Sequence, residues 1–129
     1  MSGLLPSEGN VETGGEPSPR VHWLEDDETE HLIGTLACDT ARKILSSLHD
    51  APATAAELAT EVETSIQNTR HHLGNLTEAE LVRIAGTRYS EKGREMKVYA
   101  PVDGPFVVCV GGDERDREGV TDAISSFLE

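Results

Sequence analysis

Two helix-start signals stand close together in the middle of the chain and constrain its fold more than any other feature. Thr54 is followed three positions later by Glu57, the spacing of a capping box that satisfies free backbone N–H groups at a helix start. Ser65 can cap a second helix in the same way. Inward positions at helical spacing follow each cap: Leu58, Ala59 and Val62, then Ile66, Thr69, Leu73 and Leu76. The segment therefore predicts two short helices joined by a tight turn at residues 63–64.

Further helices are expected on both sides of this pair. Asp39 is a suitable N-cap for a helix that ends near residues 49–52, with Ala41, Ile44, Leu45 and Leu48 on one face. Residues 24–37 have an acidic first turn and an apolar stripe, which favours another helix. Asp113 predicts a last helix over residues 114–128, with an apolar stripe made by Val120, Ala123, Ile124, Phe127 and Leu128.

The character of the chain changes after residue 80. Residues 81–85 read as a strand, residues 86–93 as a long turn with glycine at its bends, and residues 96–99 as the returning strand. A further short strand is expected at residues 106–110, ended by two glycines. Two short helices followed by a hairpin predict an α+β fold, a winged helix-turn-helix with flanking amphipathic helices.

The same residues resemble those of a known family. The run SIQNTRHHLGNLTEAELV at residues 65–82 is similar to the recognition-helix pattern of ArsR-type transcriptional regulators. Residues 40–45, TARKIL, resemble the family's preceding helix, and residues 89–99, YSEKGREMKVY, resemble the wing of its haloarchaeal members. The resemblance covers about residues 32–100 and implies a dimeric regulator that binds DNA. Glu80 stands where the family usually has glycine, at a sharp turn that favours positive φ.

Charge is distributed unevenly along the chain. The net charge is −13, from 24 acidic residues against 11 Lys plus Arg, of which only 3 are lysine. Residues 1–63 carry −10 and residues 101–129 carry −5, whereas residues 64–100 carry +2. An acidic, lysine-poor surface is typical of proteins from extreme halophiles, with potassium or other salt ions as expected partners. The less acidic middle indicates a function that benefits from positive charge.

Helical geometry places a polar face without acidic groups on the second short helix. Amide and guanidinium side chains on such a face suit the major groove of double-stranded DNA, because they pair bidentately with adenine and guanine. Basic residues of the hairpin could meet phosphates or the minor groove. We therefore expect a recognition helix at residues 65–76 and a wing at residues 86–97. The candidate DNA-binding residues are Ser65, Gln67, Asn68, Arg70, His71, His72, Asn75, Arg88, Lys92, Arg94 and Lys97.

Other classes of function have little support in the sequence. The longest apolar run, residues 106–110, is too short to span a membrane, and no signal peptide is visible, so we expect a cytoplasmic protein. No phosphate loop, nucleophile elbow or metalloprotease motif is present, which predicts neither an enzyme nor a cofactor. Related regulators often sense metals through paired cysteines, but residues 57–62 contain no thiol and residues 114–128 no histidine, so we expect no metal site.

The sequence predicts three parts and leaves two alternatives open. Residues 1–22 read as a disordered arm, residues 23–100 as the DNA-binding domain, and residues 101–129 as a strand and a helix that forms a homodimer. The first alternative is a winged helix that serves as a protein–protein adaptor in the transcription machinery. The second is a thiol-based redox sensor that uses Cys38 and Cys109, although both cysteines are more simply small buried apolar residues.

Overall fold

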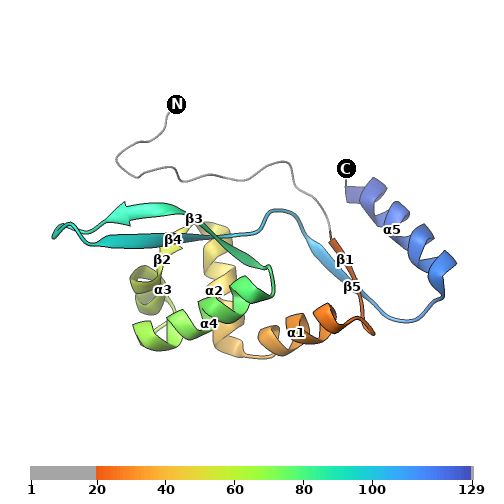
Figure 1. Ribbon diagram of the computed structural model, residues 1–129, viewed down its shortest axis with the longest axis horizontal. Helices are drawn as coiled ribbons and strands as arrows, with labels where there is room; N and C mark the ends of the chain where they lie inside the picture. The colour runs from red at the N-terminus through yellow and green to blue at the C-terminus, as the bar shows by residue number, and fades with distance from the viewer. Residues whose placement is uncertain (1–19, 129) are drawn as a thin grey trace.

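The computed structural model describes residues 20–128 as five helices and five strands (Figure 1). In chain order these are β1 (Arg20–Trp23), α1 (Asp27–Leu36), α2 (Asp39–Asp50), β2 (Ala53–Thr54), α3 (Ala55–Glu61), α4 (Ile66–Glu78), β3 (Val82–Tyr89), β4 (Glu95–Pro101), β5 (Phe106–Cys109) and α5 (Glu114–Leu128). One sheet has the order β2-β4-β3 and is antiparallel, whereas β1 and β5 form a separate parallel pair. The α+β winged helix-turn-helix architecture is therefore confirmed.

Local capping explains where most helices begin. Thr54 and Glu57 form the expected capping box at the start of α3, and the Ser65 hydroxyl accepts a hydrogen bond from the backbone N–H of Asn68. At the start of α5, Asp113 Oδ1 accepts from the N–H of Asp116 at 3.0 Å. The expectation for α2 was wrong by one residue, because Cys38 is the N-cap and Asp39 lies in the first turn. The Asp39 carboxylate pairs with Lys43 at 3.1 Å, and its negative charge at the N-terminal end of α2 interacts favourably with the helix dipole.

The core lies between the three central helices and the hairpin. Its largest fully buried apolar side chains come from α2, α3, α4, β3 and β4: Ile44, Leu48, Leu58, Leu73, Leu76, Val82 and Val98. Leu32 of α1 joins this cluster at 2 % exposure. Burial of the stripes on α2, α3 and α4 fixes how these helices pack and so orients the outer face of α4.

The hairpin is longer than the sequence predicted. Residues 86–89, expected in a long turn, continue strand β3, and the turn covers only residues 90–94. The strand absorbs Gly86 through a register shift between Ile84 and Gly86, after which pairing with β4 resumes. Backbone pairing along β4 thus outweighs the turn preference of Gly86. Gly93, at φ +80°, supplies the bend instead.

Segments from the two ends of the described chain pair with each other. Residues 20–22, predicted to end a disordered arm over residues 1–22, form β1 with Trp23, and β1 runs parallel to β5. The rest of that predicted arm, residues 1–19, lies outside the described residues. The expected strand at residues 106–110 is confirmed as β5, which ends at Cys109. Pairing across such a sequence distance leaves no local signal, so β1 was missed.

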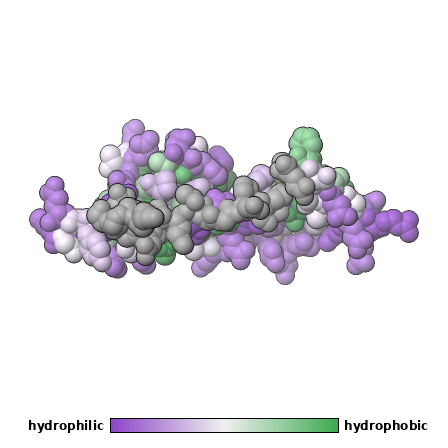
Figure 2. Space-filling model, turned by 90° about the horizontal axis from the view of Figure 1, so that it is seen from above, coloured by the Kyte–Doolittle hydropathy of each residue, from purple (hydrophilic) through white to green (hydrophobic). Residues whose placement is uncertain are grey.

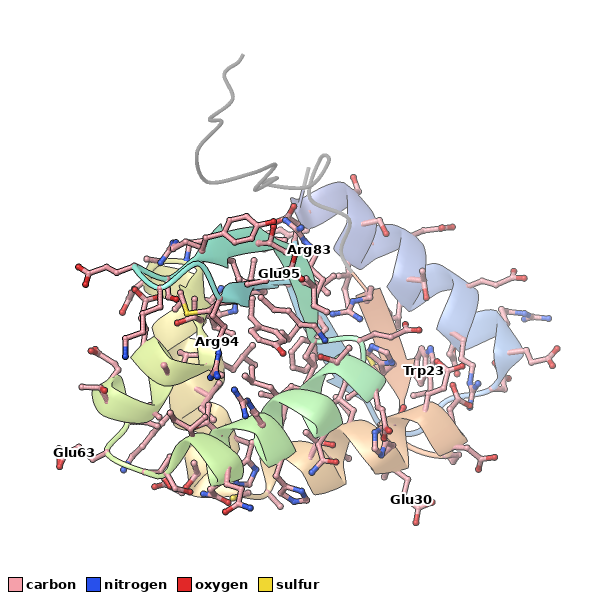
Figure 3. The ribbon with its side chains drawn as sticks, turned by 60° about the vertical axis from the view of Figure 1, so that its left-hand side comes forward. Trp23, Glu30, Glu63, Arg83, Arg94 and Glu95 are labelled. Carbon is pink, nitrogen blue, oxygen red and sulfur yellow. The ribbon has the colours of Figure 1, made fainter. Side chains whose placement is uncertain are left out.

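Two non-glycine residues adopt left-handed backbone conformations at sharp turns. Glu63, between α3 and α4, has φ 57°, and Glu80, after α4, has φ 60°. Figure 3 shows Glu63 projecting outward at its turn. The carbonyl oxygen of Glu80 accepts a hydrogen bond from Arg20 Nη1 at 2.7 Å, which ties β1 to the end of α4. The sharp turn expected at Glu80 is therefore present, with a positive φ that is strained for glutamate and that glycine would adopt without strain.

Helix α5 is held to the body through Arg117. Its guanidinium lies 5.0 Å from the ring centroid of Trp23 and contacts the carboxylates of Glu25 at 3.3 Å and Asp26 at 3.6 Å. In Figure 1 the helix stands at one end of the molecule, beside the β1–β5 pair. Within the described part of the chain, no helix is both long and apolar enough to cross a membrane.

Candidate nucleic-acid interface

Helix α4 buries one face and exposes the other largely as predicted. Thr69, Leu73 and Leu76 are at most 1 % exposed. Ile66, which the sequence placed on the same inward face, is instead 43 % exposed. As the first residue of α4 it lies at the edge of the buried stripe, where it lines an open groove.

Up to Thr77, the solvent side of α4 carries donors and acceptors without negative charge. Gln67, Arg70 and His71 are exposed, and Glu78 is the first acidic residue in the helix. These three side chains differ in chemistry, since they offer an amide, a guanidinium and an imidazole. In a chain of net charge −13, this surface is suited to a negatively charged partner.

Two of the predicted contact residues, Asn68 and Asn75, are half-buried and already engaged. The Nδ2 of Asn68 donates to Thr64 Oγ1 at 3.0 Å, and its backbone N–H donates to the Ser65 hydroxyl at 3.0 Å. Asn75 Nδ2 lies 3.5 Å from His71 Nε2, on the same face one turn later. Ser65 and Asn68 therefore stabilise the start of α4, whereas Asn75 orients the exposed His71.

His72 packs inward against the start of α2. Its Nε2 lies 3.8 Å from the Sγ of Cys38, and its ring centroid lies 5.3 Å from that of His71. Burial lowers the pKa of His72 below its ordinary value, and the neighbouring His71 lowers it further. His72 is therefore neutral near pH 7 and is a packing residue in this structure, although the sequence suggested a DNA contact.

A groove of about 450 Å³ separates α4 from the hairpin. It runs between the start of α3, the first turns of α4 and strand β4. Its cationic lining comes from Arg70, Arg94 and Lys97, and Glu95 adds one carboxylate. Figure 3 shows Arg94 extending from the hairpin towards α4. The groove thus brings together three predicted site residues from two separate elements.

The apolar part of this groove was not predicted as a site. Ile66, Met96 and Tyr99 line it beside the cations. The sequence had predicted Ile66 on the inward face of its helix and singled out neither Met96 nor Tyr99 as a site residue. The available signal was weak, because an isoleucine at the first helical position lies on the border between buried and exposed faces.

Arg88, another predicted contact residue, is paired within the chain. Its Nη1 lies 3.1 Å from both carboxylate oxygens of Glu57, which also accepts the Thr54 N–H at 2.9 Å. That backbone hydrogen bond is the largest cause that lowers the pKa of Glu57; partial burial opposes it and Arg88 adds to it. Lys92 and Arg94, by contrast, are exposed in the hairpin turn, and Lys97 is exposed on β4.

Residues 20–128 contain no cluster of three or more His, Cys, Asp or Glu side chains placed to hold a metal ion. Cys38 and Cys109 both fall in this range and are free thiols. The adjacent His71 and His72 face different surroundings, one solvent and the other α2.

Comparison with known proteins adds a family match to this geometry. A family model described as a helix-turn-helix domain matches residues 36–85, which contain α2, α3, α4 and the start of β3. No curated protein sequence matches the chain.

Solved structures that are similar include several named as ArsR-type regulators. An ArsR-like regulator from Rhodococcus is 26 % identical with a TM-score of 0.48, and the match covers 77 % of this chain and 80 % of that one. The homodimeric DNA-binding domain of a possible ArsR-family regulator from Mycobacterium bovis is 16 % identical, with a TM-score of 0.49 and coverage of 78 % and 80 %. Reduced HlyU from Vibrio cholerae is 24 % identical, with a TM-score of 0.47 and coverage of 59 % and 74 %.

The family match and the described elements agree on the nature of the central segment: residues 36–85 match the helix-turn-helix domain family, and with its β3–β4 hairpin the chain is a winged helix-turn-helix protein that resembles ArsR-type regulators.

Proposed function

We propose that the protein is a sequence-specific transcriptional regulator that binds double-stranded DNA as a homodimer. Helix α4, which contains nearly all of the predicted recognition segment 65–76, enters the major groove, and the hairpin follows the backbone or minor groove. The observation that carries this proposal is the outer face of α4 over residues 66–77, which has no acidic side chain and lies beside Arg94 and Lys97, in a chain of net charge −13. A surface kept free of negative charge in so acidic a chain favours a polyanionic partner.

The exposed residues divide into base readers and phosphate contacts. Gln67 and Arg70 have the donor geometry to pair bidentately with adenine and guanine, and His71 lies beside them on the outer face. Lys92, Arg94 and Lys97, which lie on the hairpin, supply charge to the phosphates. The other predicted site residues hold these groups in place, namely Ser65, Asn68, His72, Asn75 and Arg88.

We assign dimerisation to residues 101–129 and to α1, the helix expected at residues 24–37. Phe127 of α5 is 87 % exposed, and Val110, just before that helix, is 71 % exposed. Figure 2 shows a hydrophobic protrusion near the end of the molecule that carries α5, on an otherwise largely hydrophilic face. A second copy would cover these side chains and set two α4 helices about 34 Å apart, one turn of DNA. Light scattering that shows a monomer at micromolar concentration would contradict this assignment.

We interpret the acidic residues outside residues 64–100 as an adaptation to a cytoplasm of high salt. Carboxylates outside residues 64–100 would hold potassium ions, and some of these ions would remain between the protein and the phosphates when DNA binds. This assignment is supported by the composition and by the uneven charge along the chain.

The test is a selection from random duplexes at molar KCl, followed by binding to the enriched sequence. The proposal predicts enrichment of an inverted repeat with half-sites one turn apart. Arg70→Ala should weaken binding to the enriched duplex, whereas Lys43→Ala, which removes one positive charge from α2, outside α4, the wing and the proposed dimerisation segments, should not. Failure to enrich any duplex would favour the adaptor function instead.

A further inference from the structure

We propose that Ile66 reads the 5-methyl group of a thymine in the major groove, and so sets one position of the recognised sequence. This inference rests on the proposed DNA-binding function and names a specificity-determining residue for it. It starts from the exposure of Ile66, which helical periodicity alone would have buried.

The position of Ile66 suits contact with bases. It is the first residue of α4, directly after the Ser65 cap. In helix-turn-helix proteins the N-terminal residues of the recognition helix are those that reach the base edges. Ile66 and Arg70 are separated by one helical turn, and both line the groove between α4 and the hairpin.

A single exposed isoleucine is ordinary on a protein surface, so its surroundings decide the argument. Met96 and Tyr99 line the same groove as Ile66 and give it an apolar wall. The same groove is also lined by three cationic side chains, those of Arg70, Arg94 and Lys97. The one carboxylate of the groove, on Glu95, accepts a hydrogen bond from the Tyr89 hydroxyl at 3.4 Å. The excess of positive charge suits the phosphates that flank a base, and the apolar wall suits a part of a base without hydrogen-bonding groups.

Base chemistry identifies that part. An isoleucine side chain has neither donor nor acceptor, so it cannot distinguish bases by hydrogen bonds. In unmodified DNA the major groove presents only one apolar group, the 5-methyl of thymine. Ile66 would therefore favour thymine over cytosine or uracil at the base that faces the start of α4.

The experiment removes that methyl from the DNA one position at a time. Each thymine of the selected duplex is replaced by deoxyuridine, which leaves the hydrogen-bonding pattern unchanged. The wild-type protein should lose about fourfold in affinity at one thymine of each half-site, the value expected for one buried methyl group. Ile66→Ala should lose a similar factor on the thymine duplex and then be indifferent to deoxyuridine at that position.

Matched variants separate this effect from a change in folding. Ile66→Val should keep the sensitivity to deoxyuridine. Ile84→Ala removes an isoleucine of comparable exposure, 49 %, from β3, outside the predicted wing and the proposed dimerisation segments, and should also keep it. Thermal unfolding checks that each variant is folded.

Three results would overturn the inference while leaving the proposed function intact. The first is a selected site that has no thymine opposite the start of α4. The second is a wild-type protein whose affinity is unchanged by every deoxyuridine substitution. The third is an Ile66→Ala variant that loses as much affinity as the wild type when deoxyuridine replaces thymine. Absence of binding to any duplex would instead contradict the proposed function itself.

Discussion

Arg88 and Glu57 join the hairpin to the helix that precedes α4. Nη1 of Arg88, on β3, lies 3.1 Å from each carboxylate oxygen of Glu57, in the first turn of α3. Both side chains are partly exposed, at 35 % and 53 %, so the pair contributes at most about 1 kcal/mol. Its main consequence is geometric, because it fixes the wing relative to the helices and occupies a cation that the sequence had assigned to DNA.

Arg88 should therefore differ from the free wing cations in how it affects binding. Each phosphate contact that is lost lowers the slope of log affinity against log salt by about 0.9. Replacing Arg94 or Lys97 by alanine should make this slope less steep by that amount for each protomer. Arg88→Ala should lower the affinity with little change in the slope. The measurement is a salt titration of the three variants on one duplex. Equal slope changes for Arg88 and Arg94 would mean that Arg88 leaves Glu57 for a phosphate.

The pKa of Glu57 predicts how stability depends on pH. Its folded pKa lies below the ordinary value of 4.5, so the fold favours the charged form. This contribution is complete above the unfolded pKa and is lost as the pH falls from there through the lowered folded value. Glu57→Gln keeps a residue that can complete a capping box but does not titrate.

Urea unfolding of both proteins from neutral pH to below pH 4 measures this contribution. The stability advantage of the wild type over Glu57→Gln should shrink as the solution is acidified past the ordinary glutamate pKa. An advantage that stays constant across this range would show that the carboxylate charge is not involved.

Glu80 carries a backbone strain that one substitution should relieve. A side chain in the left-handed region costs about 1 kcal/mol, and Glu80 has φ 60°. Glu80→Gly should stabilise the fold by up to about 1 kcal/mol, since the greater freedom of glycine in the unfolded chain offsets part of the gain. Glu80→Ala removes the same charge but keeps Cβ, so it should give no such gain. If both variants shift the unfolding midpoint equally, charge rather than backbone strain is responsible.

High salt should weaken DNA binding less than in an ordinary DNA-binding protein. At about 1 M salt the Debye length is about 3 Å, so repulsion between DNA and the distant acidic segments is screened. Potassium ions retained between carboxylates and phosphates would offset those released. Affinity should therefore depend weakly on KCl, or even rise with it, over a range of about 0.5 to 2 M. A steep decline, with the slope for six or more released ions, would contradict this part of the account.

The predictable parts of the fold were those encoded by neighbouring residues. The capping box at Thr54 and the cap at Ser65 are local, and each places its helix start where the structure has it. The burial of Thr69, Leu73 and Leu76 on α4 also followed from helical spacing alone, although the same spacing wrongly predicted that Ile66 is buried. The pairing of β1 with β5 depends on two segments far apart in sequence, and Gly86 became part of a strand only because β4 was available to pair with it.

The candidate site was predictable in outline but not in detail. Spacing identified the outer face of α4, yet it could not show which polar side chains find partners inside the chain. Asn68 is held by Thr64, His72 packs against Cys38, and Arg88 pairs with Glu57. Each of these contacts depends on three-dimensional packing or on a choice among several neighbours. The same holds for Ile66, whose exposure depends on how the hairpin lies beside α4.

The central claim, that α4 reads sequence while the wing supplies charge, is tested most directly by a ratio of affinities. The ratio compares the selected duplex with a scrambled duplex of equal length, at one KCl concentration. Arg70→Ala should lower this ratio by about fivefold to 150-fold, since a lost bidentate base contact costs about 1–3 kcal/mol. Lys97→Ala should weaken binding to both duplexes by a similar factor and leave the ratio unchanged. A ratio that Arg70→Ala leaves intact, or that falls equally in both variants, would contradict the account.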